Sequence, residues 1–143
     1  MIYLDTSFLT PLFREEATSA KVAEFLSQQA ADTLAVSKWA SIEFASLTSR
    51  DVRVNALTAS QGHRLIAEFD LMVAISLVVL NPDANDFDLA QKYVTNFATQ
   101  LRGPDALHLA VAHNNGMEFI ATLDNRMLSA AKKLKVSARR VIS

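Results

Sequence analysis

Residues 2–7 read Ile-Tyr-Leu-Asp-Thr-Ser: a short apolar run, then an acid, then two hydroxyl side chains. An apolar run of this length is typical of a strand, and hydroxyl residues directly after it are suited to starting a helix. We therefore predict a strand over 2–4 with Asp5 at its carboxyl end. The same pattern returns late in the chain, where the apolar run 119–123 stops at Asp124.

Strands and helices alternate between these two segments. The runs 34–36 and 77–80 are further predicted strands, and the second is closed by Asn81-Pro82. Because that run is continuously apolar, we expect a central strand covered on both faces. Helices are predicted from apolar spacing, cap residues and Gly-Pro at a helix start, over 19–29, 38–49, 55–74, 85–99, 104–114 and 126–134. A weak last strand is expected near Val141.

This order of elements predicts one α/β domain over residues 1–143, with a mostly parallel central sheet flanked by helices. The length of 143 residues fits a single domain, since domains cluster around roughly 100–150 residues. Half of the residues are hydrophobic (50%) and 20% are charged, which excludes a disordered chain.

Composition also excludes several kinds of site. The chain has no cysteine, so it can form neither a disulfide nor a thiolate metal site, and a cytoplasmic protein is the simplest interpretation. The longest apolar stretch, 71–80, is far shorter than the roughly 20 residues that cross a bilayer, and no secretory signal precedes Asp5. Only three glycines are present, without a glycine-rich phosphate loop, so a nucleotide-binding domain is not supported.

Acids stand at the predicted strand ends. Because ligands of parallel sheets bind beyond the carboxyl ends of the strands, Asp5 and Asp124 should face one crevice. Either acid, taken alone, would also fit a helix cap. These two positions therefore indicate a site only in combination with others.

Two more acids lie on predicted helices. Glu43 interrupts the apolar face that carries Ala40 and Phe44, where a carboxylate needs a metal ion or a buried Arg or Lys partner. Asp105 stands in the first turn of the helix 104–114, a place where the helix dipole favours a carboxylate in any case. That helix is mostly apolar or small, so its start should lie close to the sheet edge and face the crevice.

Asp5, Glu43, Asp105 and Asp124 would repel one another if they met without partners, and hard divalent cations resolve that conflict. We predict that all four bind Mg²⁺ or Mn²⁺ and are catalytic. A pair of such ions activates a water molecule for phosphodiester cleavage. Two divalent cations would also turn the net charge of −1 positive, which suits a polyanionic substrate.

The segments around these acids carry a resemblance. Tyr-Leu-Asp5-Thr-Ser, Ser-Ile-Glu43-Phe-Ala, Arg-Gly-Pro-Asp105-Ala-Leu-His-Leu-Ala and Thr-Leu-Asp124-Asn-Arg resemble, in order, the four acidic motifs of PIN-domain proteins. Length and motif context are most similar to the VapC toxins of toxin–antitoxin pairs. The resemblance implies a PIN-like three-layer fold, a metal-dependent endoribonuclease that cleaves RNA, a small cognate antitoxin protein as partner, and often a homodimer.

Neighbouring polar residues are assigned smaller roles. We expect the hydroxyls of Thr6 and Thr122 to hold the carboxylates in register. Asn125 and Arg126 are candidates for contacting a phosphate, although a helix-capping Asn and a solvated Arg fit equally well.

The three histidines, His63, His108 and His113, are expected to be ordinary packing or surface residues, because the last two are five apart and lie on different faces of one helix.

Two other functions compete with the nuclease. A PIN-like module that binds RNA or protein without cutting is the alternative, and the presence of all four acids favours the enzyme over it. A phosphatase or receiver-like domain using Asp5 as phosphoacceptor lacks the second acid two residues on that such phosphatases use.

Overall fold

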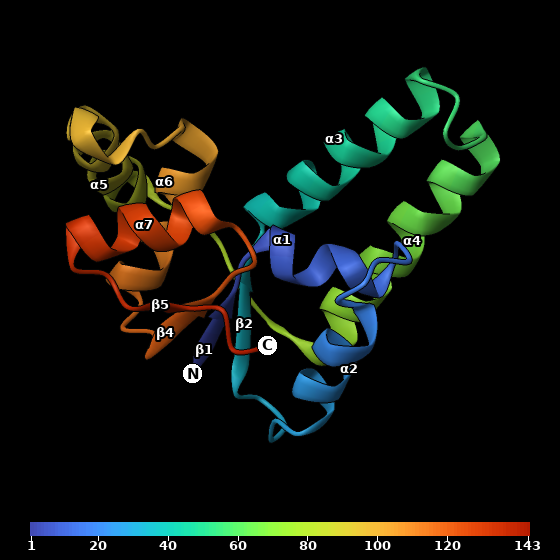
Figure 1. Cartoon of the computed structure of the whole chain (residues 1–143), viewed down its shortest axis with the longest axis horizontal. Helices are drawn as coiled ribbons and strands as arrows, with labels where there is room; N and C mark the ends of the chain where they lie inside the picture. Colours follow the sequence, from blue (N-terminus) through green and yellow to red (C-terminus); the bar gives the residue numbers. More distant parts are fainter.

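Five parallel strands form the central sheet of the computed structural model, which describes residues 1–143 (Figure 1). The strands are β1 (Ile2–Leu4), β2 (Leu34–Ser37), β3 (Val78–Leu80), β4 (Phe119–Ala121) and β5 (Ala138–Arg139). Their order across the sheet is β3-β2-β1-β4-β5, and every neighbouring pair is parallel. The predicted α/β class with a parallel sheet is confirmed.

Helices cover both faces of the sheet. They are α1 (Thr6–Leu9), α2 (Ser19–Ser27), α3 (Trp39–Arg53), α4 (Ala59–Ser76), α5 (Ala84–Thr95), α6 (Gly103–Asn114) and α7 (Asn125–Leu134), with short 3₁₀ helices η1 (Thr10–Leu12) and η2 (Phe97–Thr99). In Figure 1, α5, α6 and α7 lie on one side of the sheet and α1 to α4 on the other.

The strand alternation divides the core into two halves. Tyr3 and Ile120 point to the side of α5, α6 and α7, whereas Leu4, Phe119 and Ala121 point to the side of α1 to α4. Each half is a cluster of buried apolar side chains, as expected for a sheet whose faces are covered by helices. The result is a three-layer α/β/α sandwich.

The position predicted for β3 is wrong, because this strand lies at an edge of the sheet rather than at its centre. Leu77, just before β3, packs against one half of the core and Leu80 against the other, while Val79 is 36% exposed. The apolar run therefore overstates the burial of this strand, whose residues are half-buried or exposed. It carries no information about how many neighbouring strands there are.

Three boundaries also differ from the sequence predictions. Helix α4 begins at Ala59 rather than near Asn55, because Thr58 and Gln61 form a capping box there. The predicted helix 85–99 ends at Thr95 and is followed by η2. The last strand is Ala138–Arg139, and Val141 instead packs against the core after the strand has ended.

Helices α3 and α4 form a long antiparallel hairpin that projects from the sheet (Figure 1). They pack closely at Gly62, where an added Cβ would stand 2.8 Å from Cγ2 of Val52. The first turns of α3 stay next to the carboxyl end of β2. None of the helices combines the length and the apolar character required to cross a membrane.

Candidate functional site

A pocket of about 530 Å³ lies at the carboxyl ends of the strands, where α1, α3, α6 and α7 come together. All four predicted acids line it: Asp5, Glu43, Asp105 and Asp124. The remaining lining residues are Thr6, Ser7, Trp39, Ile42, Ser46, Leu47, Arg102 and Pro104. The structure thus brings together four carboxylates from segments that are far apart in the sequence.

Asp5 lies at the floor of the pocket and is only 4% exposed. Its Oδ2 accepts hydrogen bonds from Ser7 Oγ at 2.6 Å and from Thr122 Oγ1 at 2.8 Å. Although Asp5 directly precedes α1, its side chain makes no cap hydrogen bond, so the helix-cap alternative does not apply to it. Two hydroxyls therefore fix this carboxylate while it faces the pocket.

Asp124 lines the pocket and also caps a helix. Its Oδ1 accepts from the backbone N–H of Arg126 at 2.8 Å and of Met127 at 3.4 Å, which caps α7. The backbone N–H of Asp124 donates to Thr122 Oγ1 at 3.1 Å. Because the same hydroxyl donates to Asp5, Thr122 links the two strand-ending acids.

Glu43 sits in the second turn of α3 with its side chain 21% exposed. Thr6 Oγ1 donates to its Oε1 at 2.7 Å, and Nε2 of His108 makes a short contact with the same oxygen. Burial raises the pKa of Glu43, but the hydrogen bond and charge of His108 outweigh it and lower the pKa overall. The partner of Glu43 is therefore a histidine, not the Arg or Lys that the sequence left open.

His108 on α6 is the residue that sequence reasoning missed, because the structure buries it completely behind the acids rather than among ordinary packing residues. Its Nδ1 is 2.5 Å from the Tyr3 hydroxyl, and its Nε2 is 3.3 Å from Thr6 Oγ1 and 3.7 Å from Asp5 Oδ1. Burial lowers its pKa, but Glu43 and the nearby carboxylates raise it overall. The imidazole is placed to offset the charge of two of the acids.

A spacing in the sequence could have revealed this histidine. His108 lies three residues after Asp105 on the same helix, and residues three apart share a helical face. This spacing puts His108 on the face of the helix that carries Asp105, and so toward the crevice. The comparison with His113 alone does not show this.

Asp105 is the least compensated of the four acids. It lies in the first turn of α6, half-buried, and its carboxylate forms no hydrogen bond or ion pair. Burial, together with the negative charges of Asp5, Asp124 and Glu43, raises its pKa from 3.8 to about 6, and His108 offsets only part of this. The pocket therefore holds more negative charge than the protein itself neutralises.

The smaller roles predicted from sequence separate into two groups. Thr6 and Thr122 lie against Glu43 and Asp5, in the places expected of residues that hold carboxylates in register. Asn125 and Arg126 are exposed at the start of α7 and do not line the pocket. The arginine that does line it is Arg102, just before α6.

The donor set fits a hard divalent cation, since the side-chain oxygens that line the pocket are those of four carboxylates and of the hydroxyls of Thr6, Ser7 and Ser46. In the structure as it stands, however, no three Asp, Glu or His side chains are close enough to enclose one ion. Glu43 is engaged with His108, and Asp105 stands apart at the helix start. The carboxylates would have to move toward one another to share a metal.

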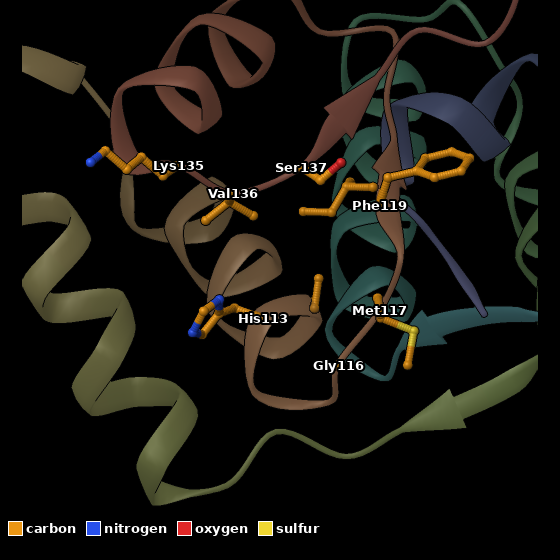
Figure 2. A pocket seen from close by; sticks show the side chains of 9 residues that line it. His113, Gly116, Met117, Phe119, Lys135, Val136 and Ser137 are labelled. Carbon is orange, nitrogen blue, oxygen red and sulfur yellow. The ribbon is translucent and has the colours of Figure 1, made fainter.

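A second hollow, of about 280 Å³, lies at the opposite end of the sheet, at the amino ends of β4 and β5. Figure 2 shows His113 and Lys135 on one side of it and Met117 and Phe119 on the other. No acid lines this hollow, so it offers no carboxylate to a hard cation. The acidic pocket is the candidate site.

Comparison with known proteins shows to which family the chain belongs. The family model of the PIN domain matches residues 2–133. The fold is similar to that of VapC20 of Mycobacterium tuberculosis, a toxin that cleaves the sarcin–ricin loop, with a TM-score of 0.74 and 19% identity over 91% of this chain and 95% of that one.

Two further solved structures share the fold. VapBC-1 of nontypeable Haemophilus influenzae gives a TM-score of 0.68 at 19% identity over 97% of each chain, and FitAcB of Neisseria gonorrhoeae gives 0.69 at 16% over 96% of each. No curated protein sequence matches the chain. Since the family model spans nearly all of its length, the chain belongs to the PIN domain family.

Proposed function

We propose that this protein is a metal-dependent endoribonuclease and the toxin of a toxin–antitoxin pair, with Asp5, Glu43, Asp105 and Asp124 as the ligands of Mg²⁺ or Mn²⁺. One observation carries the proposal: Asp105 lies half-buried in one pocket with three other carboxylates, and this burial together with their negative charge raises its pKa to about 6. Perturbed acids in a cleft are typical of functional sites. Membership of the PIN domain family supports a nuclease.

Different groups of the chain would hold each of three carboxylates in place. Ser7 and Thr122 fix Asp5, Thr6 and His108 fix Glu43, and the backbone at the start of α7 fixes Asp124. Carboxylates held in this way keep their free oxygens aimed at the pocket, which favours metal binding. When bound, the ions supply activation of water and stabilisation of the charge that develops on the phosphate.

Cleavage of total RNA by the purified protein tests the proposal. We expect cutting with Mg²⁺ or Mn²⁺, none in excess EDTA, and a loss greater than about 100-fold for Asp105→Asn, because a ligand charge is removed. Asp88→Asn, an exposed acid on α5, is the matched control and should cut normally. Undiminished cleavage in EDTA, or by Asp105→Asn, would overturn the proposal.

A non-catalytic RNA- or protein-binding module is the second candidate, and it is supported by the lack of three Asp, Glu or His side chains close enough to enclose one ion. The two functions differ in their response to metal. A nuclease whose acids bind ions should melt at a higher temperature in Mn²⁺, since a ligand of the native state stabilises it by mass action. A melting temperature independent of Mn²⁺ would favour the binding module.

We further propose that a small cognate antitoxin covers the pocket and places a basic side chain among the acids. Solved structures with this fold include VapBC assemblies bound to promoter DNA. Arg suits such a contact because it pairs with carboxylates through two hydrogen bonds. Co-expression with the neighbouring small gene should yield a complex and relieve toxicity, and failure of both would count against this partner.

The homodimer implied by the family resemblance stays a prediction. Sedimentation of the purified chain should give twice the mass of the monomer, 15.7 kDa. A monomer at all accessible concentrations would contradict it.

A further inference from the structure

A row of hydrogen-bonded side chains runs behind the acidic pocket, from Tyr3 on β1 through His108 on α6 to Glu43 on α3. Tyr3 and His108 are both fully buried, and the Tyr3 hydroxyl lies 2.5 Å from Nδ1 of His108. The two rings also meet edge to face, with centroids 5.7 Å apart. Nε2, the other ring nitrogen, contacts Oε1 of Glu43. Tyr3 does not line the pocket, so it can act on this acid only through the histidine.

The hydrogen bonds of Glu43 fall on one of its two oxygens. Oε1 accepts from Thr6 Oγ1 at 2.7 Å and contacts Nε2 of His108. Oε2 accepts no hydrogen bond, and the only side-chain polar atom that is buried without a partner is Nε1 of Trp39. Because Glu43 lines the pocket, its Oε2 is the oxygen that remains open there. The contacts of Oε1 thus decide which way the carboxylate is turned.

Glu43 depends on such a hold more than its neighbours in the pocket. Asp5 and Asp124 are shorter and are held by groups two residues further along the chain, the hydroxyl of Ser7 and the backbone N–H of Arg126. Glu43 has one more rotatable bond, so more rotamer freedom must be lost to fix it. It also stands on α3, which projects from the sheet together with α4 (Figure 1).

His108 can hold this carboxylate only with a hydrogen on Nε2. Glu43, whose pKa is lowered overall, is ionised near neutral pH and can only accept. Burial, and after it the charge of Asp5, raises the pKa of Tyr3 well above its usual value, so the hydroxyl keeps its proton. This hydroxyl can donate to Nδ1 of a neutral imidazole or accept from a protonated one. In either state, the contact with Tyr3 directs the Nε2–H group at Glu43.

We propose that Tyr3 is a positioning residue of the metal site: through His108 it holds Oε1 of Glu43 and keeps Oε2 available to the divalent cation. This inference rests on the proposed function, in which Glu43 is a metal ligand. Loss of a group that orients a metal ligand typically lowers metal affinity by about 10–100-fold. Tyr3 acts from one contact further away, so its removal should lie near the lower end of this range.

Binding of Mn²⁺ to the full chain, measured without RNA at one fixed pH, tests this role. Free Mn²⁺ gives an electron paramagnetic resonance signal that is lost on binding, so a titration yields Kd. We expect Tyr3→Phe to raise Kd about 10-fold. Tyr93→Phe is the matched control and should leave Kd unchanged. Tyr93 is buried in the same half of the core, is not hydrogen-bonded to His108 and does not line the pocket.

Two substitutions of His108 separate its two contacts. Gln places an amide near the position of Nε2 and can reach Glu43, whereas Asn places one near Nδ1 and can reach only Tyr3. His108→Gln should therefore raise Kd about 10-fold and His108→Asn about 100-fold. Adding Tyr3→Phe to His108→Gln should change Kd no further, because the contact that Tyr3 makes is already gone. A role in packing alone predicts that the two effects add.

Proton nuclear magnetic resonance of the metal-free protein examines the same hold without any ion. Only His108 is buried, while His63 and His113 are exposed, so only the ring N–H of His108 should exchange slowly with water. We expect its signal in the wild type and in Tyr93→Phe. In Tyr3→Phe it should broaden and shift, because the ring has lost the partner that orients it. Far-ultraviolet circular dichroism verifies that each variant is folded.

Equal Kd values for the wild type and Tyr3→Phe would overturn the proposal. Tighter binding by Tyr3→Phe would also overturn it, because His108 would then be withholding Glu43 from the ion. Additive effects in the double variant would overturn it in favour of packing. A wild type that binds no Mn²⁺ would refute this role together with the proposed metal-dependent nuclease. Metal binding and cleavage that Tyr3→Phe leaves unchanged would refute the positioning role alone.

Discussion

Replacing Asp105 by Asn should stabilise the metal-free protein, because it removes the carboxylate of the pocket that the protein compensates least. The pKa of Asp105 is about 6 in the folded protein and 3.8 ordinarily. A difference of this size corresponds to about 3 kcal/mol between the two protonation states. Since Asp105 is only partly buried, solvent screens the repulsion, and we expect a gain of about 1 kcal/mol, or about 2–4 °C in melting temperature.

The sign of the pH dependence follows from the raised pKa of Asp105. Near pH 4 the carboxyl is protonated in the folded protein and half protonated in the unfolded chain, so the charge costs the fold little. As the pH rises through 6, the folded protein must accept the ionised form, and the cost reaches its full value. The advantage of Asp105→Asn should therefore be absent near pH 4 and complete at pH 8.

Thermal denaturation in EDTA at pH 4, 6 and 8 measures this advantage. Asp70→Asn, an exposed acid on α4, is the control and should show no pH-dependent gain. Asp5→Asn should instead lower the melting temperature, because it disturbs the hydrogen bonds from Ser7 and Thr122. An Asp105→Asn variant that is no more stable than the wild type at pH 8, or equally more stable at all three pH values, would refute the reasoning.

Two other substitutions test the packing around the site. Tyr3→Phe keeps the ring but removes the hydroxyl that contacts Nδ1 of the buried His108. Urea denaturation should therefore show a free energy of unfolding lower by about 1–3 kcal/mol. A decrease below about 0.5 kcal/mol would show that this hydrogen bond contributes little. Gly62→Ala should cost about 1–3 kcal/mol in the same assay, because its Cβ would meet Val52 at 2.8 Å. Helix propensity alone predicts a gain of about 1 kcal/mol for that change, so a stabilised variant would mean that α3 and α4 separate easily.

The acids of the site could be predicted from sequence because each stands in a recognisable local sequence pattern. Asp5 and Asp124 end apolar runs, and parallel strands bring such ends to one edge of a sheet. Glu43 interrupts an apolar helical face, and Asp105 opens a mostly apolar helix. None of these local patterns depends on which strands are neighbours. The prediction of the four acids is therefore correct in placing them in one pocket although the predicted position of β3 is wrong.

The contact between Tyr3 and His108 and the place of Arg102 in the pocket could not be predicted in the same way. The hydroxyl of Tyr3 reaches His108 across 105 residues of sequence, and no local pattern around either residue indicates the pair. Arg102 and Arg126 both stand at helix starts, and only the folded arrangement shows that the first lines the pocket. Contacts between distant segments depend on strand order and helix packing, which short patterns do not encode.

The histidine behind Glu43 gives the acidic pocket an internal counter-charge. Because an imidazole contacts Glu43 and lies 3.7 Å from Asp5, the chain itself offsets part of the charge of these two acids. Folding can therefore bring these two acids close together before any ion binds.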